Sequence, residues 1–102
     1  MSSSKIEMQP REIAESLSDA LAGEITVRRE AMGLSKNETA TRAGLAVSFV
    51  SDLESKKRRP SIETLVKLAW VFETTASEIL AKIEKDVKFS EAREKHRKTS
   101  GL

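Results

Sequence analysis

The residues best suited to chemistry in this chain are four consecutive cations, Lys56–Arg59, at the end of a short polar and apolar segment. Lysine and arginine side chains bind phosphate oxygens through charge and hydrogen bonds, so a run of this kind can hold a nucleic-acid backbone. Residues 36 to 59 contain six basic and three acidic side chains, a balance of +3 in a chain of net charge +2. Positive charge therefore gathers on this segment, as binding to nucleic acid requires.

The residues that precede these cations predict two short helices joined at Gly44. Small or apolar residues stand where a tight helix pair faces inward: Ala40, Ala43, Leu45, Phe49, Val50 and Leu53. The last three recur at i, i+1 and i+4, so the second helix buries one face and exposes the other. This is the layout of a helix-turn-helix unit, whose second helix enters the major groove of DNA.

Three further helices are predicted around this unit. Apolar residues recur every four positions after Pro10 and predict an extended N-terminal helix over residues 10 to 32. Pro60 and Ser61 open a fourth helix, whose predicted apolar face is Ile62, Leu65, Val66, Leu68, Ala69 and Phe72, with Trp70 at its edge. A capping pattern at Thr75 opens a C-terminal helix. Because no strand pattern occurs, the predicted fold class is all-α, a compact domain of five helices.

At 102 residues the chain is long enough for one small domain with a single core. We expect a disordered N-terminus over residues 1 to 9 and a helix-turn-helix domain over residues 10 to 90. Residues 91 to 102 hold four basic and two acidic side chains and few apolar ones. This composition predicts a basic, disordered tail.

Several chemistries are excluded by what the sequence lacks. Cysteine is absent, so disulfides and thiolate metal sites cannot form. No run approaches the roughly 20 apolar residues of a membrane span, and the start lacks a signal-peptide core, so we expect a cytoplasmic protein. His96 is the sole histidine, and neither paired carboxylates nor a glycine-rich phosphate loop is present. We therefore expect no enzyme activity, no cofactor, no metal and no small-molecule ligand.

Residues 21 to 80 resemble the lambda-repressor-like helix-turn-helix family, the Xre/Cro/C1 type of phage and bacterial repressors. The residues that carry the resemblance are Gly33, Leu34, Ser35, Ala40, Gly44, Leu45, Val50, Leu53, Glu54, Pro60, Ser61, Ser77, Glu78, Ile79 and Leu80. No single position is decisive, but their joint spacing is specific. The resemblance implies a compact DNA-binding domain of five helices.

The resemblance also assigns roles to residues of this sequence. The positions that would contact DNA bases are Val47, Ser48, Ser51 and Asp52. The candidates for phosphate contact are Lys36, Arg42, Lys56, Lys57, Arg58 and Arg59. Arg29 and Glu54 stand where the family forms a buried ion pair, which would be a scaffold rather than a binding site.

Five features depart from the family pattern. Ala46 replaces the usual serine or threonine cap of the third helix, a change that typically costs about 1 kcal/mol. Lys56 and Glu73 replace the glycines that end the third and fourth helices, and Thr39 replaces a leucine. The base-contacting positions also lack the Arg, Lys, Asn and Gln side chains that usually pair with base edges.

Three functions are compatible with these features. The first is a sequence-specific regulator of transcription that binds double-stranded DNA, a repressor or autoregulating controller. The alternative is an antitoxin-like or adaptor module that uses the same fold to bind a protein. The third, which the features favour least, is a nonspecific nucleoid-associated protein that binds DNA through the basic tail.

An apolar stripe extends past the point where the family fold usually ends. Ile79, Ile83 and Val87 predict a homodimer contact or, alternatively, packing against Ile13 and Leu17 of the first helix. A dimer implies a near-palindromic operator with half-sites about 10 bp apart, or a multiple of that spacing.

Overall fold

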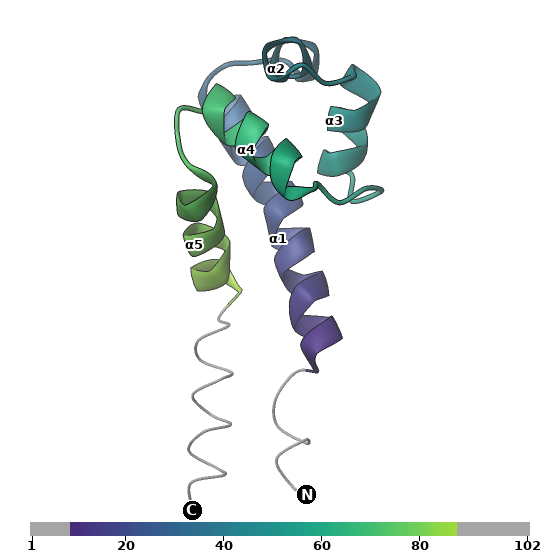
Figure 1. The fold of residues 1–102 in the computed structure, drawn as a ribbon, viewed down its shortest axis with the longest axis vertical. Coiled ribbons are helices and arrows are strands. Elements are labelled where there is room, and N and C mark those ends of the chain that lie inside the picture. The colour runs from purple at the N-terminus through teal and green to yellow at the C-terminus, as the bar shows by residue number, and fades with distance from the viewer. Residues whose placement is uncertain (1–8, 88–102) are drawn as a thin grey trace, which may run out of the picture.

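The computed structural model describes residues 9–87, and every regular element in that range is an α-helix. The helices are α1 (Pro10–Ala31), α2 (Lys36–Ala43), α3 (Val47–Glu54), α4 (Ile62–Val71) and α5 (Ala76–Asp86) (Figure 1). The predicted all-α class with five helices is therefore confirmed. The tails predicted to be disordered, with His96, lie outside the described residues, except for Gln9, which caps α1.

Hydroxyl side chains begin three of the five helices. The Oγ of Ser35 accepts a hydrogen bond from the Glu38 amide at 2.9 Å, and the Glu38 carboxylate accepts one from the Ser35 amide at 2.8 Å. Ser61 and Thr75 cap α4 and α5 in the same way, each accepting from an amide at 3.1 Å. The helix α3 differs, because Ala46 offers no side-chain acceptor. Its first-turn amides are therefore not used by a cap.

Helices α1 to α4 all end on a residue in the left-handed conformation. Gly33 and Gly44 have φ angles of 69° and 71°, and Lys56 and Glu73 have φ angles of 70° and 59°. At each end the following amide donates back to the helix, as Lys57 does to the Asp52 carbonyl at 2.9 Å. A side chain in this conformation costs about 1–2 kcal/mol, whereas glycine avoids the clash. Lys56 and Glu73 thus occupy turns of the kind that glycine forms elsewhere in the domain.

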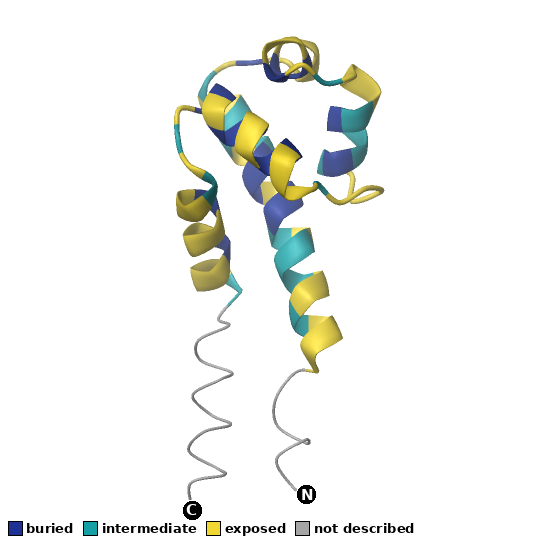
Figure 2. Ribbon diagram, in the orientation of Figure 1, coloured by how far each residue is buried: buried dark blue, intermediate teal, exposed yellow. Residues whose placement is uncertain are grey.

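The core lies where α1 crosses the other helices. Helix α1 packs against α5 and α3, and α2 packs against α3 and α4 (Figure 1). The largest buried side chains are Leu21, Ile25, Leu34, Leu53, Leu65, Leu68, Phe72, Ile79 and Ile83. Figure 2 shows that the buried residues of each helix face this centre. Full burial of one such side chain contributes about 1.5–3 kcal/mol, so the helices hold one another in place.

The predicted apolar face of α4 is only partly correct. Leu65, Leu68, Ala69 and Phe72 are buried, but Ile62, Val66 and Trp70 are 81%, 51% and 82% exposed. Residues spaced by four drift slowly around a helix, so these three form a stripe beside the core-facing side rather than within it. We call Ile62, Val66 and Trp70 the α4 stripe.

The prediction that Ile79 and Ile83 form a dimer contact is wrong. Both are core residues, 0% and 1% exposed, on the side of α5 that packs against α1. The long α1 offers an apolar surface that a domain of this size must cover, and α5 covers it within the same chain. Val87 is half-buried. The alternative interpretation, packing against helix one, therefore holds for the two isoleucines.

Thr39 gives a stability prediction. This residue is fully buried, and its hydroxyl has no hydrogen-bond partner among the described residues. A buried polar group without a partner costs about 1–3 kcal/mol, and valine has nearly the same shape. Thr39→Val should therefore raise the free energy of unfolding by about 1–2 kcal/mol in urea titrations.

Thr64 provides the matched control. It is also buried, but its hydroxyl accepts a hydrogen bond from Ser61 at 3.1 Å. Thr64→Val should lower the free energy of unfolding by about 0.5–1.5 kcal/mol. If the two substitutions changed the free energy of unfolding by the same amount, the buried Thr39 hydroxyl would not be costing the protein the desolvation energy assigned to it.

Candidate nucleic-acid interface

The helix α3 presents one face to solvent because its other face is fixed in the core. Val50 and Leu53 are fully buried, which anchors the helix on α1 and α2. Val47 and Ser48 are exposed, and Ser51 and Asp52 are half-buried. The four positions predicted to contact bases therefore lie together on the outward side of one short helix, although two of them are partly covered.

A guanidinium group lies along the edge of this face. Nε of Arg58 is 3.5 Å from the Asp52 carboxylate, and the guanidinium carbon is 5.6 Å from the centre of the Phe49 ring. The ring and the carboxylate both attract the cation, which stays largely exposed. Sequence reasoning missed this role of Phe49, because a contact between an exposed loop residue and a helix follows no periodic pattern.

The four consecutive cations form an exposed loop directly after α3. The amides of Lys57 and Arg58 both donate to the Asp52 carbonyl, at 2.9 Å and 3.2 Å. These bonds hold the loop at the C-terminal end of α3, where the helix dipole favours positive charge. We call Lys56, Lys57, Arg58 and Arg59 the cationic loop, and all four side chains are exposed.

Lys36 is the first residue of α2 and is exposed there. It stands beside the Ser35–Glu38 capping box, where the hydrogen bond from the Ser35 amide lowers the pKa of the Glu38 carboxyl. Glu38 therefore remains charged and partly offsets Lys36 at this end of α2.

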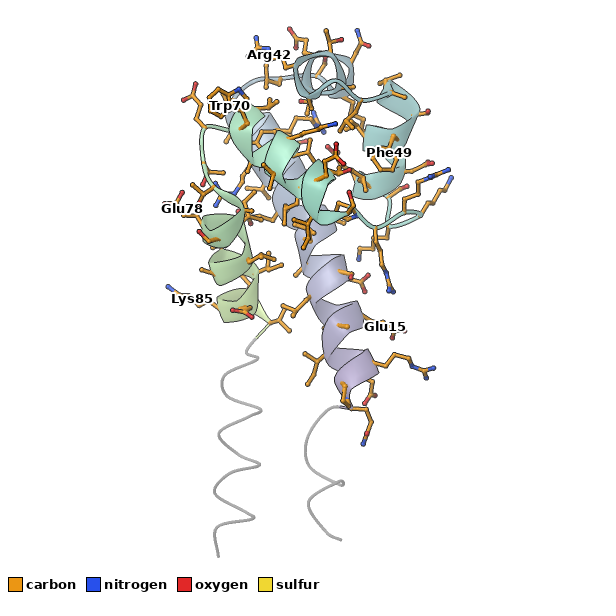
Figure 3. The ribbon with its side chains drawn as sticks, viewed as in Figure 1. Glu15, Arg42, Phe49, Trp70, Glu78 and Lys85 are labelled. Carbon is orange, nitrogen blue, oxygen red and sulfur yellow. The ribbon has the colours of Figure 1, made fainter. Side chains whose placement is uncertain are left out.

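Arg42 lies apart from the cationic loop. It lines a shallow hollow with Trp70, Val71, Glu73 and Thr74 between α2 and the end of α4. Figure 3 shows Arg42 beside Trp70, with Phe49 on the other side of the molecule. Arg42 and the cationic loop therefore lie at different places on the domain surface. A count of charges along residues 36 to 59 groups them together, because it takes no account of how the helices are arranged.

The predicted ion pair forms, and it fastens α3 to α1. Nε and Nη2 of Arg29 donate to the two carboxylate oxygens of Glu54 at 2.7 Å and 3.0 Å, and Nη1 donates to the Leu34 carbonyl at 2.8 Å. The side chains are only 11% and 6% exposed. The hydrogen bonds to Glu54 raise the pKa of Arg29. The pair fixes the C-terminal end of α3 and hence the start of the cationic loop.

Within residues 9–87, no three His, Cys, Asp or Glu side chains come close enough to hold a metal ion. None of the helices in this range has the length and apolar character that crossing a membrane demands.

Comparison with known proteins agrees with this architecture. The model of the helix-turn-helix family matches residues 25–79. No curated protein matches the chain. Among solved structures, the chain is similar to the clp gene regulator ClgR from Corynebacterium glutamicum, with a TM-score of 0.66 and 19% sequence identity. The match covers 81% of this chain and 88% of that one, and at this identity it supports the fold alone.

Proposed function

Since the chain belongs to the helix-turn-helix family of the lambda-repressor-like type, we propose that it regulates transcription by binding double-stranded DNA. In this proposal α3 enters the major groove, and the cationic loop binds the phosphates beside it. The protein acts as a repressor or an autoregulating controller.

The observation that carries the proposal is the position of the cationic loop relative to α3. A helix that is to enter a groove needs an uncovered face and cations close enough to bind the flanking phosphates. Val47 and Ser48 are exposed on that face, and the loop follows it directly. The uncapped first turn of α3 leaves amides that can donate to a phosphate oxygen.

The proposed contacts with bases are weaker than the bidentate contacts that Arg, Lys, Asn or Gln side chains form. Val47 can touch a thymine methyl group, Ser48 and Ser51 can donate or accept, and Asp52 can accept from cytosine N4. The Asp52 carboxylate must also lie near phosphates, and the guanidinium of Arg58 at 3.5 Å reduces that repulsion. Part of the specificity would then come from DNA shape.

We further propose that the regulator acts as a homodimer on a near-palindromic operator. One α3 contacts few base pairs, and two copies related by a two-fold axis double the contact and its specificity. The half-sites would lie about 10 bp apart, or a multiple of that spacing.

Titration of a mixed-sequence duplex at two salt concentrations tests the DNA-binding role. Binding followed by fluorescence anisotropy should be weak and should fall steeply between about 50 and 200 mM salt. A selected operator from a random duplex library should bind at least about 1,000-fold more tightly than the mixed sequence. No binding at low salt would contradict the proposal and favour the protein-binding adaptor, which the neutral-to-acidic face of α3 also suits.

A further inference from the structure

The α4 stripe is the apolar surface that neither the core nor the proposed DNA contact uses. Six large apolar side chains are exposed among residues 9–87: Val27, Val47, Ile62, Val66, Trp70 and Leu80. Three of these lie at intervals of four on one helix, and the others stand singly on α1, α3 and α5. Figure 2 shows exposed residues along α4. A contiguous apolar stripe that includes an exposed tryptophan is typical of a protein interface.

We propose that the α4 stripe binds the same stripe of a second copy, with the two helices antiparallel about a two-fold axis at Val66. This contact is the interface of the homodimer in the proposed function. It rests on that function only for the expectation that the protein forms a dimer. The isoleucines of α5 cannot serve, because they are buried within one chain.

The register of the stripe favours a second copy as its partner. Val66 stands midway between Ile62 and Trp70. A two-fold axis through Val66 brings each Val66 onto its counterpart and each Ile62 onto the partner's Trp70. Both ends of the interface then contain one isoleucine and one tryptophan, so the two contacts are identical.

A second shallow hollow, which shares Arg42 and Trp70 with the one described above, can accommodate the partner's Ile62 side chain. It has a volume of about 250 Å³ and is lined by Arg42, Ala43, Val66, Lys67 and Trp70. Ile62 is 81% exposed, so the described residues cover little of its side chain. In the antiparallel arrangement, Ile62 of each copy approaches the hollow beside the other copy's Trp70, in the manner of a ridge entering a groove.

The charges beside the stripe are compatible with the same arrangement. Lys67 and Glu63 pair within the chain at 3.1 Å and are 43% and 77% exposed. They lie on one flank of the stripe, so an antiparallel copy brings Lys67 of one chain toward both Glu63 and Lys67 of the other. The two attractions between Lys67 and Glu63 offset the single repulsion between the two lysines.

The sole tryptophan of the chain allows a direct test on the free protein. As the concentration rises from about 0.1 to 100 µM, the fluorescence maximum of Trp70 should move to shorter wavelength while light scattering reports a dimer. Val66→Glu should keep the protein monomeric and Trp70 solvent-exposed at every concentration. Val27→Glu is the matched control, since Val27 is 60% and Val66 51% exposed, and it should dimerise as the unmodified protein does.

The absence of cysteine allows the register to be tested as well. Val66→Cys should form a disulfide-linked dimer on mild oxidation, since that residue meets its own counterpart. Ile62→Cys should not, because two copies of residue 62 would lie about 12 Å apart along the helices. Val27→Cys should also remain unlinked.

Two outcomes would overturn the contact. A protein that stays monomeric with an exposed Trp70 at all concentrations would assign the stripe to a different partner. Linking of Ile62→Cys or Val27→Cys as fast as Val66→Cys would disprove the register. Both tests are made without DNA, so the contact can fail while salt-dependent DNA binding persists, and the reverse is equally visible.

Discussion

Replacing Arg29 with alanine should lower the free energy of unfolding by about 3–5 kcal/mol, as much as the truncation of a large core side chain. The substitution removes three hydrogen bonds at once and leaves the Glu54 carboxylate, 6% exposed, without its cation. A buried charge that loses its partner is strongly destabilising, because the protein can replace neither the bonds nor the lost hydration. The total free energy of unfolding of a domain of this size is only about 5–15 kcal/mol.

Arg28 is the matched control for this prediction. It is the next residue of α1, and its Nε donates to the Glu24 carboxylate at 2.7 Å. Arg28 is 26% exposed, and the buried Glu24 carboxylate keeps a second cation when Arg28 is removed, because Nζ of Lys82 lies 3.8 Å from it. Arg28→Ala should therefore cost much less, about 0.5–1 kcal/mol. Urea or thermal unfolding followed by circular dichroism gives both values, and an Arg29→Ala loss no larger than that of Arg28→Ala would contradict the assigned role.

The stability contributed by the Arg29–Glu54 pair can be measured separately from the cost of leaving one of the two residues unpaired. Glu54→Ala should also be destabilising, and the double variant should cost less than the two single losses combined. Replacing both residues with apolar side chains, as in Arg29→Met with Glu54→Leu, should recover much of the stability. A double variant whose loss equals the sum of the single losses would show that the two residues act independently.

Much of this fold could be predicted from the sequence because its determinants are local. Gly33, Gly44 and Ser35 mark where helices end and begin, and the described bounds of α2 agree with those signals. The Arg29–Glu54 pair followed from the resemblance rather than from local pattern, since the residues are 25 positions apart.

The remaining features depend on tertiary packing. An apolar period shows that a helix has a face to cover but not what covers it, so Ile79 could equally have met a second copy or α1. In α4 the apolar residues exceed what one face can hold, and only packing decides that Ile62 and Trp70 stay exposed. The contact of Arg58 with Asp52 and Phe49 joins a loop to a helix and has no sequence period.

Reversing two charges of the cationic loop should have the largest effect on DNA binding. Lys57→Glu with Arg58→Glu should weaken binding to all duplexes alike, by about 10- to 100-fold at low salt, and reduce the slope of log affinity against log salt by about 2. Each lost cation releases one fewer counterion from the phosphates, and each new carboxylate adds repulsion. Both side chains are exposed, so the fold should be retained.

A change of equal charge far from α3 controls for net charge. Arg11 and Lys85 are exposed, near the start of α1 and the end of α5, and Figure 3 shows Lys85 well away from Phe49 of α3. Arg11→Glu with Lys85→Glu should leave the salt slope unchanged and reduce affinity only slightly, because charges beyond about 10 Å are screened at 0.1 M salt. Equal losses in the two variants would mean that the whole field of the protein attracts DNA and that the cationic loop makes no direct contact. A loss confined to the loop variant would instead locate the phosphate contacts beside α3, since charge at that position alone would then govern the number of counterions released.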